Sequence, residues 1–307
     1  MKKTRLLVAV LVLLCIAAPA YALNQPAVNL GFTNFLDGAS PGPGWYWTEY
    51  LQVIHATDLK NDAGLPEDIH LDGFINLNQI IYQSDVNFLG GNPGIDVIIP
   101  LVDIDADDHP VVNAQDGIGD ILVGPFIQWG PHMLFGRPYF HRFELQVTAP
   151  TGDNSASKVI NPGADVWTIN PYYAFTYFLT PKLSTSVRFH YLWSSENDNF
   201  SDLFPGVDMQ PGQAIHLNYA AAYAITEQIR LGVSGYYLKQ LEKDDLSGGG
   251  KVPPGLDNKE EVFAIGPGVV WHISPSLTFM GAVNWESSVD NRPEGVRSTL
   301  RLIWKFW

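Results

Sequence analysis

The sequence predicts an all-β protein, an antiparallel transmembrane β-barrel of about 12 strands. The last segment, 296–307 (VRSTLRLIWKFW), alternates apolar and polar residues up to the end of the chain. Roughly a dozen segments of about ten residues or more have strand character. The links between these segments alternate between short and long. Outer-membrane barrels show this alternation, because their periplasmic turns are short and their outer loops are long.

The last segment predicts the strand that closes the barrel. Its apolar parity is Leu300, Leu302, Trp304 and Phe306, and its other parity is Thr299, Arg301 and Lys305 with Ile303 as the one apolar member. Successive side chains of a strand point to opposite faces. Lipid can therefore solvate the apolar face while the lumen accommodates the polar face, and the segment can pair with the first strand. A soluble sheet would have to cover the apolar face.

Residues 1–22 have the form of a secretory signal peptide. A basic head, KKTR at 2–5, precedes an apolar run over 6–18, and AYA at 20–22 forms a small-x-small cleavage site. The run is shorter than the roughly 20 residues that a helix needs to span a bilayer. We expect cleavage after residue 22. This removes Cys15 and leaves an exported chain that does not rely on disulfides.

The charge balance argues against a nucleic-acid partner. The chain has 18 basic and 32 acidic residues. Loss of the three basic residues of the leader leaves 15 basic residues and a net charge of -17, whereas nucleic-acid binding needs a basic face. Hydrophobic residues make up 46% and aromatic residues 12% of the chain, without helical periodicity. This pattern favours strands.

The N-terminal segment 23–44 precedes the barrel, which we place at 45–307. It is rich in Asn, Gly and Pro (FLDGASPGPG) and has no periodicity. Two interpretations are open: a periplasmic tail, or a plug that folds into the lumen.

The strands follow in order from Trp45. The predicted strands are 45–55, 68–82, 86–104, 117–129, 138–150, 166–178, 183–194, 213–225, 228–240, 261–272, 277–287 and 296–307. In the second, Ile69, Leu71, Ile75, Leu77 and Ile81 share one parity, which we assign to lipid, and His70, Asp72, Asn76 and Asn78 share the other, which we assign to the lumen. The third is the least regular, because Pro100 disturbs its alternation and favours a bulge.

The links carry independent information. Tight turns are predicted at 83–85, 179–182, 226–227 and 273–276, with a somewhat longer link at 130–138, and long polar links at 56–67, 105–116, 151–165, 195–212, 241–260 and 288–295. A soluble Greek-key sandwich is the alternative. It would not sort its links by length, nor place Trp and Tyr so often at strand ends, where membrane barrels carry aromatic girdles.

Motifs spread along the chain resemble a known family. They are NLGFTNFLDGASPGPGWYW, GGNPGIDVIIPLVDID, DGIGDILVGPFIQW, APTG, HLNYAAAY, GYYLKQL and DNRPEG. As a set they resemble the outer-membrane family described as involved in the MetA-pathway of phenol degradation. The resemblance implies an outer-membrane barrel, often linked to uptake of aromatic or other hydrophobic compounds. It does not imply that the barrel performs catabolic chemistry.

The inward parity supplies the candidate substrate path. Arg or Lys facing lipid at the bilayer midplane costs about 2–4 kcal/mol, so charged parities are expected to face the lumen. The candidates are Tyr46, Tyr50, Asp72, Phe74, Asn76, Arg142, Glu144, Tyr172, Arg188, His190, His216 and Tyr236. A polar wall interrupted by aromatic rings can pass an amphipathic aromatic compound. The alternative is a network of paired charges that braces the interior. His190 and His216 share the inward parity of neighbouring strands and can face each other.

Motifs for other chemistry lack their context. GASPG at 38–42 matches a nucleophile elbow without the preceding strand and following helix. The acidic run that begins at Asp103 resembles the start of a calcium loop, but Asp108 stands where an EF-hand needs Gly and Ala114 where it needs Glu. GIG at 117–119 lacks the third glycine of a dinucleotide site. We expect no metal and no cofactor.

The sequence therefore predicts a bacterial outer-membrane channel for passive uptake of small hydrophobic or aromatic compounds. The expected partners are outer-membrane lipid and lipopolysaccharide, the barrel-assembly machinery and the small ligand. Two alternatives remain. An outer-membrane enzyme acting on lipid would need a nucleophile beside a base, and no convincing pair is found. A non-conducting structural barrel is favoured if salt bridges seal the lumen.

Overall fold

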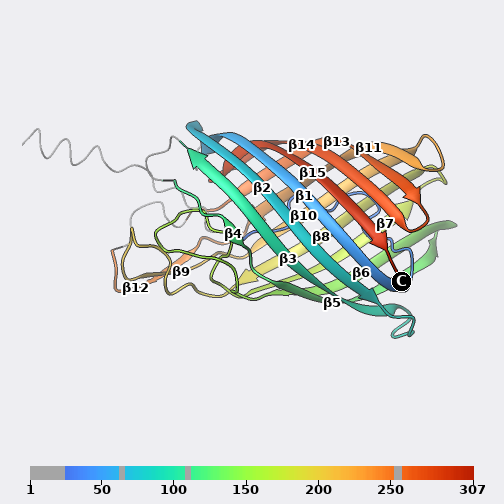
Figure 1. The fold of residues 1–307 in the computed structure, drawn as a ribbon, viewed down its shortest axis with the longest axis horizontal. Coiled ribbons are helices and arrows are strands. Elements are labelled where there is room, and N and C mark those ends of the chain that lie inside the picture. The colour runs from blue at the N-terminus through green and yellow to red at the C-terminus, as the bar shows by residue number, and fades with distance from the viewer. Residues whose placement is uncertain (1–24, 62–65, 108–111, 252–257) are drawn as a thin grey trace, which may run out of the picture.

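Twelve long strands form a closed antiparallel barrel in the computed structural model, which describes residues 25–61, 66–107, 112–251 and 258–307 (Figure 1). The barrel strands are β1 (Gly44–Lys60), β2 (Pro66–Gln83), β3 (Asn92–Asp107), β5 (Leu122–Leu134), β6 (Arg137–Thr148), β7 (Thr168–Phe178), β8 (Leu183–Ser194), β10 (Ala214–Ala224), β11 (Ile229–Gln240), β13 (Glu261–Ser274), β14 (Leu277–Asp290) and β15 (Pro293–Lys305). The short β4 (Gly117–Ile118) pairs with β3. β9 (Val207–Gln210) and β12 (Asp245–Gly248) form a separate two-stranded sheet. The predicted barrel and its strand number are confirmed.

The last strand closes the barrel, as predicted. β15 pairs with β1 from Tyr46 opposite Lys305 to Leu59 opposite Pro293. The backbone N–H of Trp45 also donates to the carbonyl of Trp307 at 2.8 Å. On β15 the predicted parity holds, because Leu300 is 47% exposed on the outside and Thr299 is 2% exposed on the inside.

The two ends of the barrel differ. The turn end carries the C-terminus, the start of β1 and the short turns, and the loop end carries the long links and the β9–β12 sheet, which projects beyond the barrel in Figure 1. By the usual arrangement of such barrels the turn end is periplasmic. Exposed Trp167, which immediately precedes β7, and half-buried Tyr177 of β7 lie near opposite ends of this strand. Ten residues of tilted strand span about 25 Å, which matches the apolar band of outer-membrane barrels.

Several predicted links were wrong. Three of them are shorter than predicted, because the strands extend further than their alternation suggested, and one is longer, because β3 begins only at Asn92. β1 and β2 are joined only by 61–65, and β14 and β15 only by 291–292, so two of the six predicted long links are short. The link within 130–138 reduces to the two-residue turn 135–136. The predicted tight turn at 83–85 is instead the eight-residue link 84–91.

The bulge predicted at Pro100 is absent from the β2–β3 pairing, where Pro100 lies opposite Leu77 without a register shift. The irregularity lies on the other side of β3. Proline has no N–H to donate, and the next strand is interrupted at 119–121, between β4 and β5. Gly119 donates its N–H to the Pro100 carbonyl at 3.0 Å.

The side-chain directions predicted for β2 were reversed. Tyr50 faces the interior, and Leu77 is its partner across the β1–β2 pair, so Leu77 also faces inward. Ile69, Leu71 and Ile81 are buried inside, whereas Phe74 and Ile80 are exposed outside. The prediction failed because it took the apolar parity for the lipid face, and in β2 the apolar parity fills the interior.

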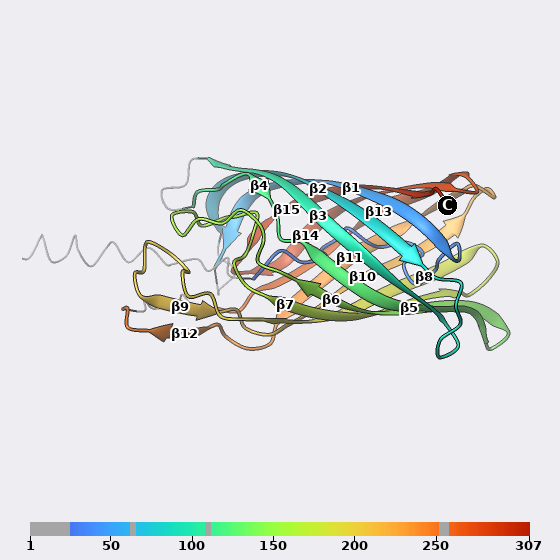
Figure 2. The same ribbon diagram turned by 60° about the horizontal axis from the view of Figure 1, so that its bottom comes forward.

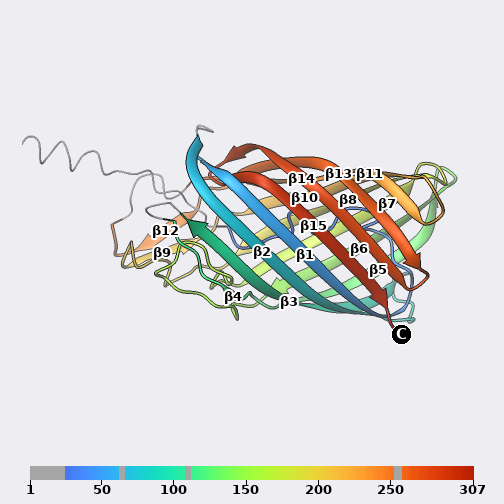
Figure 3. The same cartoon turned by 45° about the horizontal axis from the view of Figure 1, so that its top comes forward.

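Residues 25–43 run along the inside of the barrel from the loop end to the start of β1, and this part of the chain is visible in dark blue between the strands in Figure 2 and Figure 3. Leu30 and Phe35 are each 1% exposed and belong to two separate apolar clusters with wall residues. The predicted leader, 1–22, lies outside the described residues. No helix among the described residues is long and apolar enough to cross a membrane.

Candidate functional site

The interior of the barrel is the candidate functional site, and its wall is polar and closely packed. Thr48 and Gln52 of β1, Glu144 of β6 and Asn284 of β14 are each 0% exposed, although all point inward. The side chains of the wall alone do not fill the lumen of a twelve-stranded barrel, so another part of the chain must cover these inward-facing residues. The segment 25–43 lies against this wall.

An ion-pair cluster holds the segment by its one acidic side chain, Asp37. Arg188 of β8 donates from Nε to Asp37 Oδ2 at 2.5 Å and from its terminal nitrogen to Oδ1 at 2.8 Å. Arg301 of β15 places a terminal nitrogen 3.6 Å from the same Oδ1. Two-point contacts between guanidinium and carboxylate are among the strongest side-chain interactions. This carboxylate therefore fixes the segment to two separate parts of the wall.

Hydrogen bonds from the wall also fix the backbone of the segment. Asn218 accepts from the N–H of Gly31 at 2.8 Å and donates to the carbonyl of Asn29 at 2.8 Å. Further along, the N–H of Gly38 donates to Thr176 Oγ1 at 2.8 Å, and Gln128 donates to the Gly38 carbonyl at 2.8 Å. These contacts satisfy backbone groups that would otherwise be buried without partners.

A chain of hydrogen bonds crosses the inner wall of β1, β2 and β3. The Tyr50 hydroxyl donates to Gln79 at 2.8 Å, and Gln79 donates to Asp96 Oδ2 at 2.8 Å. The other Asp96 oxygen, Oδ1, is buried without a hydrogen-bond partner. A Cβ on Gly124 would lie 2.8 Å from Asp96 Oδ1 and 2.6 Å from Glu144 Oε1, so glycine at this position lets both carboxylates approach.

Glu144 continues the polar network towards β7. It accepts from the Tyr172 hydroxyl at 2.6 Å and from Gln146 at 2.8 Å, and it lies 3.7 Å from an Arg142 nitrogen. Arg142 also donates from Nε to Gln128 at 2.9 Å. A second network on the opposite wall joins the Tyr236 hydroxyl to Glu286 at 2.7 Å and Glu286 to Arg297 at 2.9 Å. Paired charges thus brace the wall, as the alternative interpretation of the sequence proposed.

His190 and His216 face each other as predicted. Their rings are stacked, with centroids 4.0 Å apart, on neighbouring strands β8 and β10. His190 Nδ1 lies 3.1 Å from the amide oxygen of Asn170. No group of three His, Cys, Asp or Glu side chains within the described ranges is arranged to hold a metal ion.

The inner wall of β1, β2 and β3 becomes apolar towards the loop end. A buried cluster contains Ile54, Ala56, Leu59, Ile69, Leu71 and Val112, and Ile75, Ile104, Ala106, Val159 and Ile160 pack against it. Most of these residues come from the three strands. Val112, Val159 and Ile160 come from the links after β3 and β6 and cover the cluster. The barrel thus has an apolar inner surface near its outer mouth.

Most of the predicted path residues lie inside. The nine inward residues are Tyr46, Tyr50, Arg142, Glu144, Tyr172, Arg188, His190, His216 and Tyr236. Three belong to β2 and point outward, which corrects the prediction: Asp72, Phe74 and Asn76. Asp72 pairs with His55 on the outer surface at 2.7 Å. Sequence reasoning missed the inward-facing Gln79 and Asp96. The pairing of β2 with β1, which the sequence alone does not give, places Gln79 inside, opposite Thr48.

The described residues of the GASPG motif and of the acidic run from Asp103 do not form the sites that their patterns suggested. Ser40 donates to Gln83 and accepts from the N–H of Gly42 at 3.2 Å, and neither partner can act as a base. Asp103 and Asp105 lie on β3 and are exposed on its outer face, so they are part of a strand and not of a calcium loop. Asp108 lies outside the described residues.

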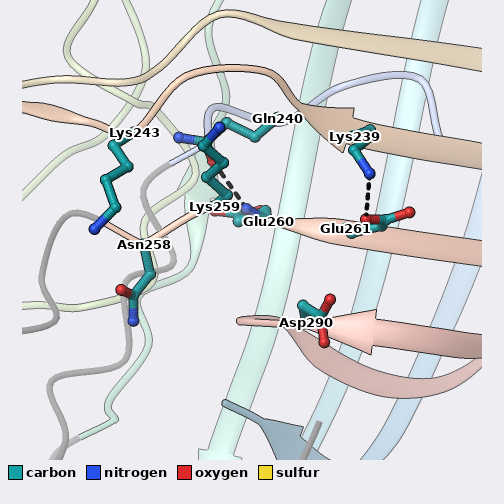
Figure 4. A pocket seen from close by; sticks show the side chains of 8 residues that line it. All are labelled: Lys239, Gln240, Lys243, Asn258, Lys259, Glu260, Glu261 and Asp290. Carbon is teal, nitrogen blue, oxygen red and sulfur yellow. Dashed lines mark hydrogen bonds and ion pairs between the residues drawn. The ribbon is translucent and has the colours of Figure 1, made fainter. Parts of the chain in front are cut away.

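A pocket of about 420 Å³ opens at the loop end of β11, β13 and β14 (Figure 4). Its charged lining residues are Lys239, Lys243, Lys259, Glu260, Glu261 and Asp290. Lys239 and Glu261 pair with each other at 3.0 Å, as the dashed line shows, and Arg292 pairs with Glu260. Its charges are of both signs and partly paired within the lining, so it favours no particular ligand.

Comparison with known proteins places the fold and the family. The crystal structure of the COG4313 outer membrane channel from Pseudomonas putida F1 is similar, with a TM-score of 0.76 and 14% sequence identity over 87% of this chain and 96% of that chain. The NanC porin is more distant, with a TM-score of 0.42 and 10% identity over 84% of this chain and 99% of that one. No curated protein sequence matches this chain. The sequence model of the family described as "Putative MetA-pathway of phenol degradation" matches residues 55–302, and the chain belongs to that family.

Proposed function

We propose that this protein is a channel of the bacterial outer membrane that takes up small hydrophobic or aromatic compounds passively. The observation that carries the proposal is the apolar inner surface of β1, β2 and β3 near the outer mouth. A water-filled pore for polar solutes gains nothing from such a lining, whereas an apolar solute gains about 25 cal/mol for each Å² that it buries there. The family description, which refers to phenol degradation, supports an aromatic substrate.

We further propose that residues 25–43 act as a plug. All the contacts named above between the segment and the wall are non-covalent, so water or a ligand can replace them. They are hydrogen bonds, one ion-pair cluster and the apolar contacts of Leu30 and Phe35. The segment is covalently joined to β1 only at Gly44. Release of these contacts would open the interior without breaking the strand pairing of the barrel.

A non-conducting structural barrel is the second candidate, and the packed interior favours it. Ion pairs such as Arg297 with Glu286, together with the buried Gln52 and Asn284, leave the middle of the barrel filled while the segment is seated. The two candidates differ in one measurable property, which is the entry of a solute that depends on the protein.

Entry of 1-naphthol into vesicles with a lipopolysaccharide outer leaflet tests the proposal. We expect faster entry with the protein than without it. Leu71→Asn places an amide in the apolar inner surface and should slow entry of 1-naphthol. Val53→Asn is the matched control, because Val53 lies outside on the neighbouring strand and is 51% exposed. Equal entry with and without protein would leave the structural barrel as the better candidate.

A further inference from the structure

We propose that Arg188 and Arg301, together with the rings of Tyr172 and Tyr50, form a binding site for the carboxylate of a small aromatic acid, and that Asp37 of the N-terminal segment occupies this site in the closed barrel. The inference deepens the proposed function and rests on it, since the ligand would reach this site through the lumen. It assigns the substrate a charge and a position.

The geometry is that of a ligand site whose occupant comes from the chain itself. Both arginines belong to the wall, whereas Asp37 belongs to the segment. In the sheet, β14, β13, β11 and β10 lie between the strand of Arg301 and that of Arg188, so the two guanidinium groups reach the carboxylate from well-separated parts of the barrel. Arg188 binds both oxygens of Asp37. This two-point contact is the one that guanidinium groups make with free carboxylates.

Aromatic rings hold both guanidinium groups in place. Arg188 lies over the ring of Tyr172 at 4.0 Å, and Arg301 lies over the ring of Tyr50 at 5.0 Å. A guanidinium group stacked on a ring keeps its N–H edges free for an anion. Phe32 of the segment packs edge-on against the ring of Tyr50, with centroids 6.1 Å apart. The segment therefore brings an aromatic ring and a carboxylate to this wall, and an aromatic carboxylate carries the same two groups.

Asp37 leaves part of the site unused. The Nε of Arg301 is buried and has no hydrogen-bond partner. Among the residues that the structure describes, Asp37 is the acid that pairs with both Arg188 and Arg301. Glu144, another inward acid of this wall, is already bonded to Tyr172 and Gln146.

Release of the segment therefore leaves two positive charges in the interior without their acid. Removing one partner of a buried ion pair is strongly unfavourable, because the other charge stays uncompensated. A carboxylate ligand restores the pairing. Ligand binding and seating of the segment are then competing events, and the ligand itself favours the open state.

The experiment measures binding of benzoate to the purified, folded protein by calorimetry, with benzamide as the uncharged ligand of the same shape. Asp37→Asn keeps the size of the side chain and removes the competing charge. We expect this variant to bind benzoate at least tenfold more tightly than the wild type does, and at least tenfold more tightly than it binds benzamide. Adding Arg188→Gln to Asp37→Asn should abolish the difference between the two ligands.

Glu286→Gln is the matched control, because it removes a buried carboxylate from Arg297, which pairs within the wall and not with the segment. It should leave benzoate affinity at the wild-type value. Phe35→Ala provides a second route if Asp37→Asn does not fold. It loosens the segment without changing a charge, and it should also strengthen binding of benzoate more than that of benzamide.

An equal affinity of Asp37→Asn and wild type for benzoate, an equal affinity of the variant for benzoate and benzamide, or the same gain in Glu286→Gln would each overturn the proposal. Binding is measured without transport, so the two hypotheses fail separately. Entry of 1-naphthol without selective benzoate binding removes the carboxylate site alone, and selective binding without entry removes the channel.

Discussion

Replacing Phe35 with Ala should release the N-terminal segment and leave the barrel folded. The Phe35 ring is 1% exposed and packs against Ala220, Ala222, Val270 and Met280 of the wall. The ring also lies close to Gly268, where an added Cβ would come within 2.5 Å of it. The contacts join the segment to the wall. Their loss therefore weakens the seating of the segment more than the strand pairing.

The size of the effect follows from the burial of the ring. A buried Phe→Ala substitution costs about 3–5 kcal/mol, from lost transfer energy and the cavity left behind. At roughly 1.4 kcal/mol for each factor of ten, the equilibrium between seated and released segment shifts by about two to three and a half powers of ten. A seated state favoured by about 3 kcal/mol or less would then be at least half lost.

Hydrogen exchange of the segment amides measures this shift directly. The N–H groups of Gly31 and Gly38 donate to Asn218 and Thr176, so they exchange with solvent when the segment leaves the wall. We expect both to exchange at least a hundredfold faster in Phe35→Ala, with unchanged exchange in the β1–β15 pairing. Phe126→Ala is the control, since Phe126 packs inside the wall with Tyr46 and Ile81. Unchanged exchange at Gly31 and Gly38, or an equal acceleration throughout β1, would refute the reasoning.

Three further predictions concern the barrel and its loops. Gly44→Ala should slow assembly and lower the melting temperature, because Gly44 has φ +142° and an added Cβ would come within 2.2 Å of the Trp307 carbonyl; an unchanged heat-dependent gel shift would contradict this. Phe189→Arg places a charge on the outer face of β8 and should cost about 2–4 kcal/mol in unfolding experiments in lipid, whereas Leu203→Arg, in an outer loop, should cost little. Burial, followed by the charges of Asp198 and Asp120, raises the pKa of Asp165 in the link between β6 and β7. The folded link then binds the proton more tightly than the unfolded chain does, so its stability rises as the pH falls through the folded pKa. In Asp165→Asn, which also suits the φ of 56° at this position, exchange of the 149–167 amides should lose that pH dependence.

The sequence was sufficient for the architecture because the architecture depends on alternation. β15 shows this most clearly, since Leu300 and Trp304 face out while Thr299 and Arg301 face in. The same alternation placed the histidine pair and the inward charges of β6 and β8 correctly. The role of Asp37 could not be predicted in this way. It lies in a segment without periodicity, and its partners stand 151 and 264 positions away along the chain.

The error in β2 has a physical cause that extends to its neighbours. β1, β2 and β3 have 17, 18 and 16 residues, although a tilted strand needs only about 9–11 to cross the bilayer. Their loop ends therefore extend beyond the hydrocarbon region, where a charged outer face, such as that of Asp72 and His55, carries no lipid penalty. The rule that polar parity faces the lumen does not apply to that part of a strand.

Nearer the middle of the barrel, polar groups face outward by pairing with each other. Asn76 donates to Glu49 at 3.1 Å, and Asn78 donates to Asn76 at 2.5 Å, all on the outer surface of β1 and β2. Hydrogen-bonded groups are far less costly in an apolar medium than unpaired ones. The apolar residues of β2 are then free to line the interior. The direction of such a strand has to be inferred from its register, because Tyr50 opposite Leu77 forces both side chains to the same face whatever their polarity.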